Sequence, residues 1–84
     1  MTNAYKSISS NLSEEMKYSP SERPICVIIS GYEDGKSPEE CLYELGMPYK
    51  TVINDKLVIA NLSPIQLRKL DKDYSIFSID ILQK

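Results

Sequence analysis

The chain has 84 residues, of which 42% are hydrophobic, and its ten basic and twelve acidic side chains give a formal net charge of −2. This length and composition predict one small globular domain and argue against disorder throughout the chain. The slight acidic balance offers no electrostatic basis for binding a nucleic-acid backbone. No apolar run reaches the length of a membrane span, so we expect no membrane partner.

The residue types needed for most catalytic and metal sites are scarce. Histidine is absent, which excludes a Ser-His-Asp or Cys-His unit within this chain and removes the commonest transition-metal ligand. Cys26 and Cys41 are too few for a disulfide framework, and we expect free thiols. The sequence therefore predicts no catalytic residue, no metal site and no cofactor, and the chain alone is not expected to be an enzyme.

Residues 1–22 are polar and rich in serine, and their apolar positions are scattered. We expect an N-terminal extension, partly flexible, with one or two helical turns at most after Ser13. The segment has no apolar stretch of the kind found in a secretory signal, so a reduced intracellular compartment is expected.

An ordered domain is expected over residues 23–84. Residues 24–30 form a β-branched run of strand length, and the loop "GYEDGK" follows. A helix is predicted next, because Ser37 is a suitable N-cap, Pro38 suits the first helical position and Glu40 could complete a capping box. Gly46 suits the position just beyond the helix end.

The second half of the chain repeats this plan. Residues 48–54 and 56–62 are predicted strands joined by a tight hairpin at Asn54-Asp55. A second helix follows a Ser-Pro-x-Gln start at Ser63, with an apolar stripe of Ile65, Leu67 and Leu70, and the last strand covers residues 74–82.

The order β-α-β-β-α-β predicts an α+β fold of the ferredoxin-like, split β-α-β type. We expect a four-stranded antiparallel sheet with two helices on one face. Right-handed crossovers place the first and third strands in the centre and the last strand beside the first.

Two helices cover only one face of such a sheet, and the other face is predicted to be unusually apolar. If Val27, Ile29, Val58, Ala60 and Ile79 point toward the helices, their neighbours point away from them. The residues expected on this second face as a partner-binding surface are Cys26, Ile28, Leu57, Ile59, Asp80 and Leu82. A contiguous apolar surface indicates an interface. Ordinary exposed surface, or cover by the N-terminal extension, is the alternative.

The motifs of the second half resemble those of a known family. Leu70-Asp71-Lys72-Asp73 ends the second predicted helix, and Ile76-Phe77-Ser78-Ile79-Asp80-Ile81-Leu82 follows without a gap. This pattern is similar to the Leu-x-Lys-Asp and Val-x-x-Val-Glu-x-Asp motifs in the propeptides of subtilisin-like serine proteases and in the related free inhibitors. The resemblance covers roughly residues 24–84, and its fold is the same β-α-β-β-α-β arrangement.

The resemblance implies a prodomain that acts as an intramolecular chaperone and as an inhibitor of the protease in the same precursor. Such propeptides lay their sheet on two surface helices of the protease, and acidic residues of the last strand cap those helices. Asp80 occupies the first acidic position, whereas Leu82 departs from the pattern at the second. After autoprocessing the tail enters the substrate cleft, which here implies the residues Ile81, Leu82, Gln83 and Lys84, with cleavage at or near this end.

Several functional interpretations remain open. Without a secretion signal, the chain fits the intracellular subtilisins or the Csp-type proteases of spore germination, which implies a cytoplasmic or spore-associated location. A free-standing protease inhibitor and a ferredoxin-like regulatory module that binds a small ligand near "GYEDGKS" are the alternatives. RNA binding lacks the aromatic residues and basic surface it requires. An acylphosphatase-like activity is rejected because Arg23 precedes the first strand without a supporting loop.

Overall fold

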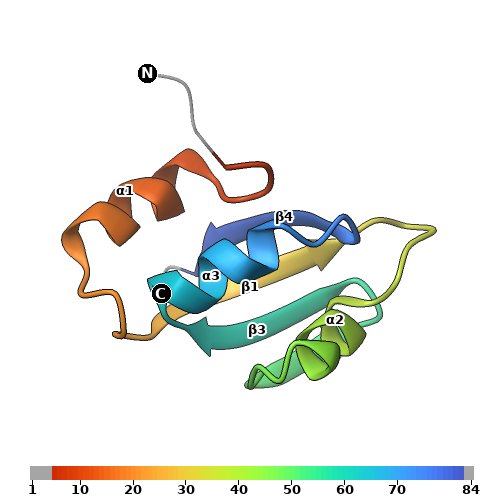
Figure 1. The fold of residues 1–84 in the computed structure, drawn as a ribbon. Coiled ribbons are helices and arrows are strands. Elements are labelled where there is room, and N and C mark those ends of the chain that lie inside the picture. The colour runs from red at the N-terminus through yellow and green to blue at the C-terminus, as the bar shows by residue number, and fades with distance from the viewer. Residues whose placement is uncertain (1–4, 83–84) are drawn as a thin grey trace.

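Four strands form one antiparallel sheet in the computed structural model of the protein, which describes residues 5–82. The elements are α1 (Ser10–Tyr18), β1 (Ile25–Gly31), α2 (Pro38–Glu44), β2 (Thr51–Asn54), β3 (Leu57–Leu62), α3 (Pro64–Asp71) and β4 (Ile76–Ile81). The strand order is β2-β3-β1-β4, with β1 and β3 in the centre (Figure 1). From β1 onward this is the predicted ferredoxin-like arrangement, and the α+β fold class is confirmed.

Local hydrogen bonds explain where α2 and α3 begin. The Ser63 hydroxyl accepts the Gln66 N–H (3.3 Å) while the Gln66 side chain accepts the Ser63 N–H (3.0 Å), which completes the predicted capping box. At α2 the Ser37 hydroxyl accepts the Glu40 N–H (3.2 Å), but the Glu40 carboxylate makes no return bond in the described part of the chain. The first capping box is therefore only half formed.

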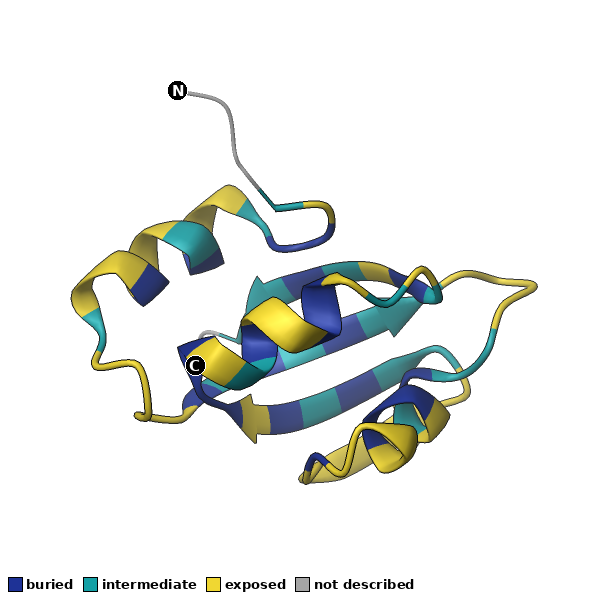
Figure 2. Cartoon of the chain, viewed as in Figure 1, coloured by how far each residue is buried: buried dark blue, intermediate teal, exposed yellow. Residues whose placement is uncertain are grey.

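The core lies between the sheet and the helices. Val27, Ile29, Val58, Ala60 and Ile79 are all fully buried, as the alternation along the strands predicts. Figure 2 shows this alternation along β1 and β3 as dark and lighter bands.

One predicted core position in α3 is wrong. Ile65 is 41% exposed, whereas Leu67 and Leu70 are fully buried. Pro64, the first residue of the helix, is buried instead and turns Ile65 outward. The apolar stripe therefore follows Pro64, Leu67 and Leu70 at helical spacing.

The N-terminal segment is part of the domain. Ile8, Leu12 and Met16 recur every four residues and are at most 4% exposed, within the same hydrophobic core as the sheet residues. The helix α1, which carries Leu12 and Met16, contacts β4 and lies toward that edge of the sheet (Figure 1). The sequence indicated an extension with at most two turns after Ser13, but the helix begins at Ser10 and supplies two core side chains, and Ile8 before it supplies a third.

Backbone pairing and one carboxylate hold this segment in place. The Ser9 N–H donates to the Ile79 carbonyl and the Ile79 N–H donates to the Ser7 carbonyl, both at 2.9 Å, so residues 7–9 run parallel to β4. The Asp71 carboxylate, at the end of α3, accepts N–H groups of residues 6–8 at 2.5–3.1 Å. The β4 edge is thereby covered by the chain itself, which protects it from pairing with another chain.

Candidate partner-binding surface

We call the sheet face opposite α2 and α3 the open face. Strand pairing places Ile28 of β1 directly opposite Ile59 of β3 on one side and Asp80 of β4 on the other. Thr51 of β2 lies opposite Ile59 in turn. Residues paired across an antiparallel sheet point to the same face, so these four side chains form one row across the open face.

Two further rows flank it. Cys26 lies opposite Asn61, and the Leu82 N–H donates to the Cys26 carbonyl at 3.0 Å. Leu57 lies opposite Ser30, which pairs with Ser78 on its other side. All six residues predicted for the partner-binding surface therefore lie on the sheet rows of this face.

The apolar members of these rows are partly exposed. Cys26, Ile28, Leu57 and Ile59 each have intermediate exposure, whereas their inward-pointing neighbours are almost fully buried. Neighbouring side chains on the sheet shield one another, but no described helix lies over them, because α1 packs its apolar side into the helix-side core. The alternative that the N-terminal segment covers this face is not what the structure shows.

An aromatic pair extends this surface at one end of the sheet. The rings of Tyr32 and Phe77 meet edge to face with centroids 5.2 Å apart, and the side chains are 47% and 57% exposed. The same two residues line a shallow hollow with Gly31, Glu33 and Lys56, and three of these five residues belong to the loop "GYEDGKS" that the sequence offered as a small-ligand site. Sequence reasoning missed this pair, although an aromatic residue inside the last strand was a readable signal.

Asp80 already has a role within its own chain. Its Oδ1 atom accepts the Ser9 hydroxyl (2.6 Å) and the Ile81 N–H (2.8 Å). Ser9 is the N-cap of α1 and accepts the Leu12 N–H (3.1 Å). Asp80 thus orients the cap of a helix of this domain, which the sequence did not indicate.

The predicted tail begins inside the sheet. Ile81 is the last residue of β4 and packs partly against the core, and Leu82 remains paired with β1 through the Cys26 carbonyl. The other two residues assigned to the tail, Gln83 and Lys84, lie outside the described residues. Ile81 and Leu82 are therefore held by the sheet, and a tail could leave the sheet only beyond Leu82.

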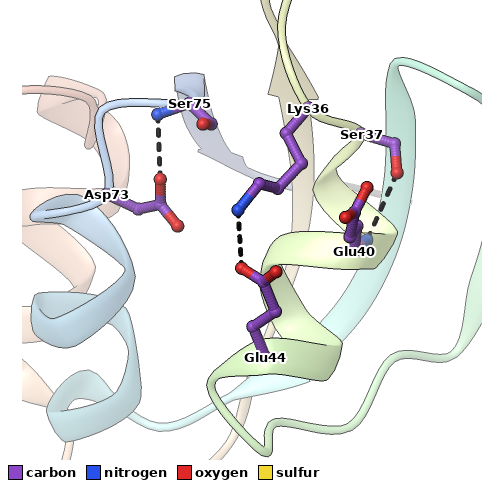
Figure 3. A network of polar contacts seen from close by, with 6 residues as sticks. All are labelled: Lys36, Ser37, Glu40, Glu44, Asp73 and Ser75. Carbon is purple, nitrogen blue, oxygen red and sulfur yellow. Dashed lines mark hydrogen bonds and ion pairs between the residues drawn. The ribbon is translucent and has the colours of Figure 1, made fainter.

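A polar network on the helix side ties the β1–α2 loop to its surroundings (Figure 3). Lys36 forms an ion pair with Glu44 at 2.6 Å, and the hydrogen bond to that carboxylate raises the pKa of the lysine. Asp73 accepts the Ser75 N–H at 2.9 Å in the turn before β4. These contacts fix the loop and the turn, which is a structural role.

Both cysteines are free, and Cys41 is fully buried beside this network. Burial, with a contribution from the nearby Asp73, raises the pKa of the Cys41 thiol to about 11, so at neutral pH it is an unreactive thiol. Within residues 5–82, no cluster of three or more Cys, Asp or Glu side chains is arranged to hold a metal ion. The same residues include no helix long and apolar enough to cross a membrane.

No protein-family model, no curated protein and no solved structure matches this chain.

Proposed function

We propose that this chain is a prodomain of a subtilisin-like serine protease, which packs its open face on the catalytic domain. In this role it assists folding of the protease and then inhibits it, and the chain beyond Leu82 occupies the substrate cleft. The observation that carries the proposal is the uncovered apolar face of a ferredoxin-like sheet. Its central row joins Ile28 and Ile59 to a carboxylate, Asp80.

The make-up of this face supports a protein partner. The centre of the sheet presents four adjacent apolar side chains, and the Tyr32–Phe77 pair adds exposed aromatic area at one end. Interfaces favour this arrangement, because central apolar and aromatic side chains contribute most of the binding energy while polar residues surround them.

Asp80 also supports the proposal, although only one of its two carboxylate oxygens is available to a partner. Its Oδ1 atom is used within the chain, and its Oδ2 atom has no hydrogen-bond partner among the described residues. The Ser9 hydroxyl therefore holds the carboxylate in place while one oxygen remains available to the N–H groups at the start of a partner helix.

The deciding experiment is inhibition of a subtilisin-like protease from the same organism by the full chain. Ile28→Lys should weaken inhibition by more than tenfold, because it places a charge at the centre of a desolvated contact. Ile65→Lys is the matched control, since Ile65 is an exposed isoleucine on α3, on the opposite face. Equal inhibition by the two variants would show that the open face does not bind the protease.

A second pair of variants separates the two roles of Asp80. Asp80→Ala should weaken inhibition by about 0.5–2 kcal/mol, the usual cost of removing a capping side chain. Ser9→Ala removes the link to α1 but leaves the carboxylate, so it should destabilise the fold with a smaller loss of inhibition. If both variants weaken inhibition only in proportion to their loss of stability, Asp80 does not touch the partner.

A free-standing inhibitor of the same proteases would use this surface in the same way. The two functions differ in whether the coding region continues into a catalytic domain with its own Asp, His and Ser. They make the same prediction for the Ile28 variant.

A further inference from the structure

A second surface lies on the helix side of the molecule, away from the open face. The N-terminal segment and the C-terminal half of α3 enclose a shallow cleft of about 480 Å³ between them. The residues that line it are Tyr5, Lys6, Arg68, Asp71, Lys72 and Tyr74. The cleft exists only because residues 5–8 are held beside α3, so it could not be recognised in the sequence.

The cleft is positively charged in a chain whose net charge is negative. Three of its side chains, Lys6, Arg68 and Lys72, are cationic, and within residues 5–82 none of them forms an ion pair within 4.0 Å. The single acid, Asp71, directs its carboxylate to the three backbone N–H groups of residues 6–8. The cations are therefore not neutralised by a partner and are available to an anion.

Two tyrosines stand beside these cations. The Lys6 Nζ atom lies 5.6 Å from the centroid of the Tyr74 ring and donates to the Asp73 carbonyl (2.9 Å) and the Ser7 hydroxyl (3.0 Å). The Arg68 Nε–H donates to the Tyr5 hydroxyl at 3.4 Å. Two of the three cations of the cleft thus each lie beside one aromatic residue.

We propose that this cleft binds a small anion that carries a flat ring, of the class of nucleoside and aryl phosphates. Arg68, Lys6 and Lys72 would bind the phosphate through charge-assisted hydrogen bonds, and the tyrosine rings would pack against the flat ring of the ligand. The volume is within the usual range of about 300–1,000 Å³ for small-ligand sites. This site is independent of the proposed protease contact, because none of its residues lies on the open face.

The test is a titration of the full isotopically labelled chain, followed by amide chemical shifts. AMP and phenyl phosphate represent the two kinds of ligand in the class, and adenosine and inorganic phosphate represent the two halves of AMP. We expect saturable shifts at residues 5–6 and 68–74 with at least one phosphate ester, and binding at least about tenfold weaker for each half. The proposal would be overturned by shifts at other residues, or by equal binding of inorganic phosphate. It would also be overturned if no saturable shift appeared up to about 10 mM ligand, on the order of the weakest useful affinities.

Variants at exposed positions test the assignment of the residues. Lys72→Gln and Arg68→Gln should each weaken binding of the phosphate ester about fivefold or more, because each removes a charge from the cleft. Lys50→Gln is the matched control, since it makes the same charge change at an exposed position outside the cleft. Both residues are exposed, so the fold should be retained, and an unchanged spectrum outside the cleft checks this. Affinities that match the control in both variants would refute the site.

Discussion

Asp71 is a single buried carboxylate whose removal should strongly lower the free energy of unfolding of this domain. It lies at the end of α3, is only 7% exposed, and accepts the backbone N–H groups of residues 6, 7 and 8. Two of these donors, Ser7 and Ile8, are themselves buried. Asp71→Ala would leave them without an acceptor.

The magnitude follows from those two donors. An unsatisfied buried N–H costs about 1–3 kcal/mol, so the substitution should lower the free energy of unfolding by about 2–6 kcal/mol. The segment could instead detach and solvate its N–H groups, but this would expose Ile8, Leu12 and Met16. Since burial of such side chains contributes about 1.5–3 kcal/mol each, detachment offers no cheaper route.

Asp71→Asn should be milder for a geometric reason. Ser7 and Ile8 donate to the same carboxylate oxygen, Oδ1, and Lys6 donates to the other, Oδ2. An asparagine carbonyl can replace the first oxygen but not the second. The asparagine variant should therefore lose less stability than the alanine variant and keep the N-terminal segment docked.

Urea denaturation gives the free energies, and amide hydrogen exchange reports directly on residues 6–8. We expect the amides of Ser7 and Ile8 to lose protection in Asp71→Ala before the central strands do. Asp34→Ala, at an exposed loop position, is the control for the change in charge. A loss below about 0.5 kcal/mol, within the range of ordinary surface substitutions, or unchanged protection of both amides would refute this account of the carboxylate.

Three further predictions concern stability. Leu12→Ala should lower the free energy of unfolding by about 2–5 kcal/mol in urea denaturation, because Leu12 is fully buried. A loss below about 1 kcal/mol, on the order of a surface substitution, would mean that α1 is not part of the core. Gly46→Ala should cost about 1 kcal/mol, since Gly46 has a φ of +71°, and an unchanged midpoint would contradict that backbone conformation. Cys41 should make stability fall as pH rises from 9.0 to about 11, because its thiol ionises at lower pH in the unfolded chain than in the folded one. Cys41→Ala should flatten this part of the plot of stability against pH, and an identical slope in the variant would exclude the thiol as the cause.

The sequence by itself was sufficient for the elements that depend on local chemistry. Ser37 and Ser63, each followed by proline, mark the starts of α2 and α3, because a hydroxyl there satisfies an N–H that the helix leaves free. The alternation in β1, β3 and the last strand, β4, identified the buried face, and with it the six residues now found on the rows of the open face. Strand order followed from the handedness of the crossovers.

The structure of the N-terminal segment and its place in the core were decided by tertiary contacts. Ile8, Leu12 and Met16 have helical spacing, but their polar neighbours made the segment resemble an extension. Their burial requires an uncovered β4 edge and an acceptor for three N–H groups, and Asp71 supplies that acceptor from 63 to 65 residues away in the chain. The partner of Asp80 is likewise a residue far away, Ser9. No local pattern encodes such contacts, because their free energy arises only when the folded sheet brings the two ends of the chain together.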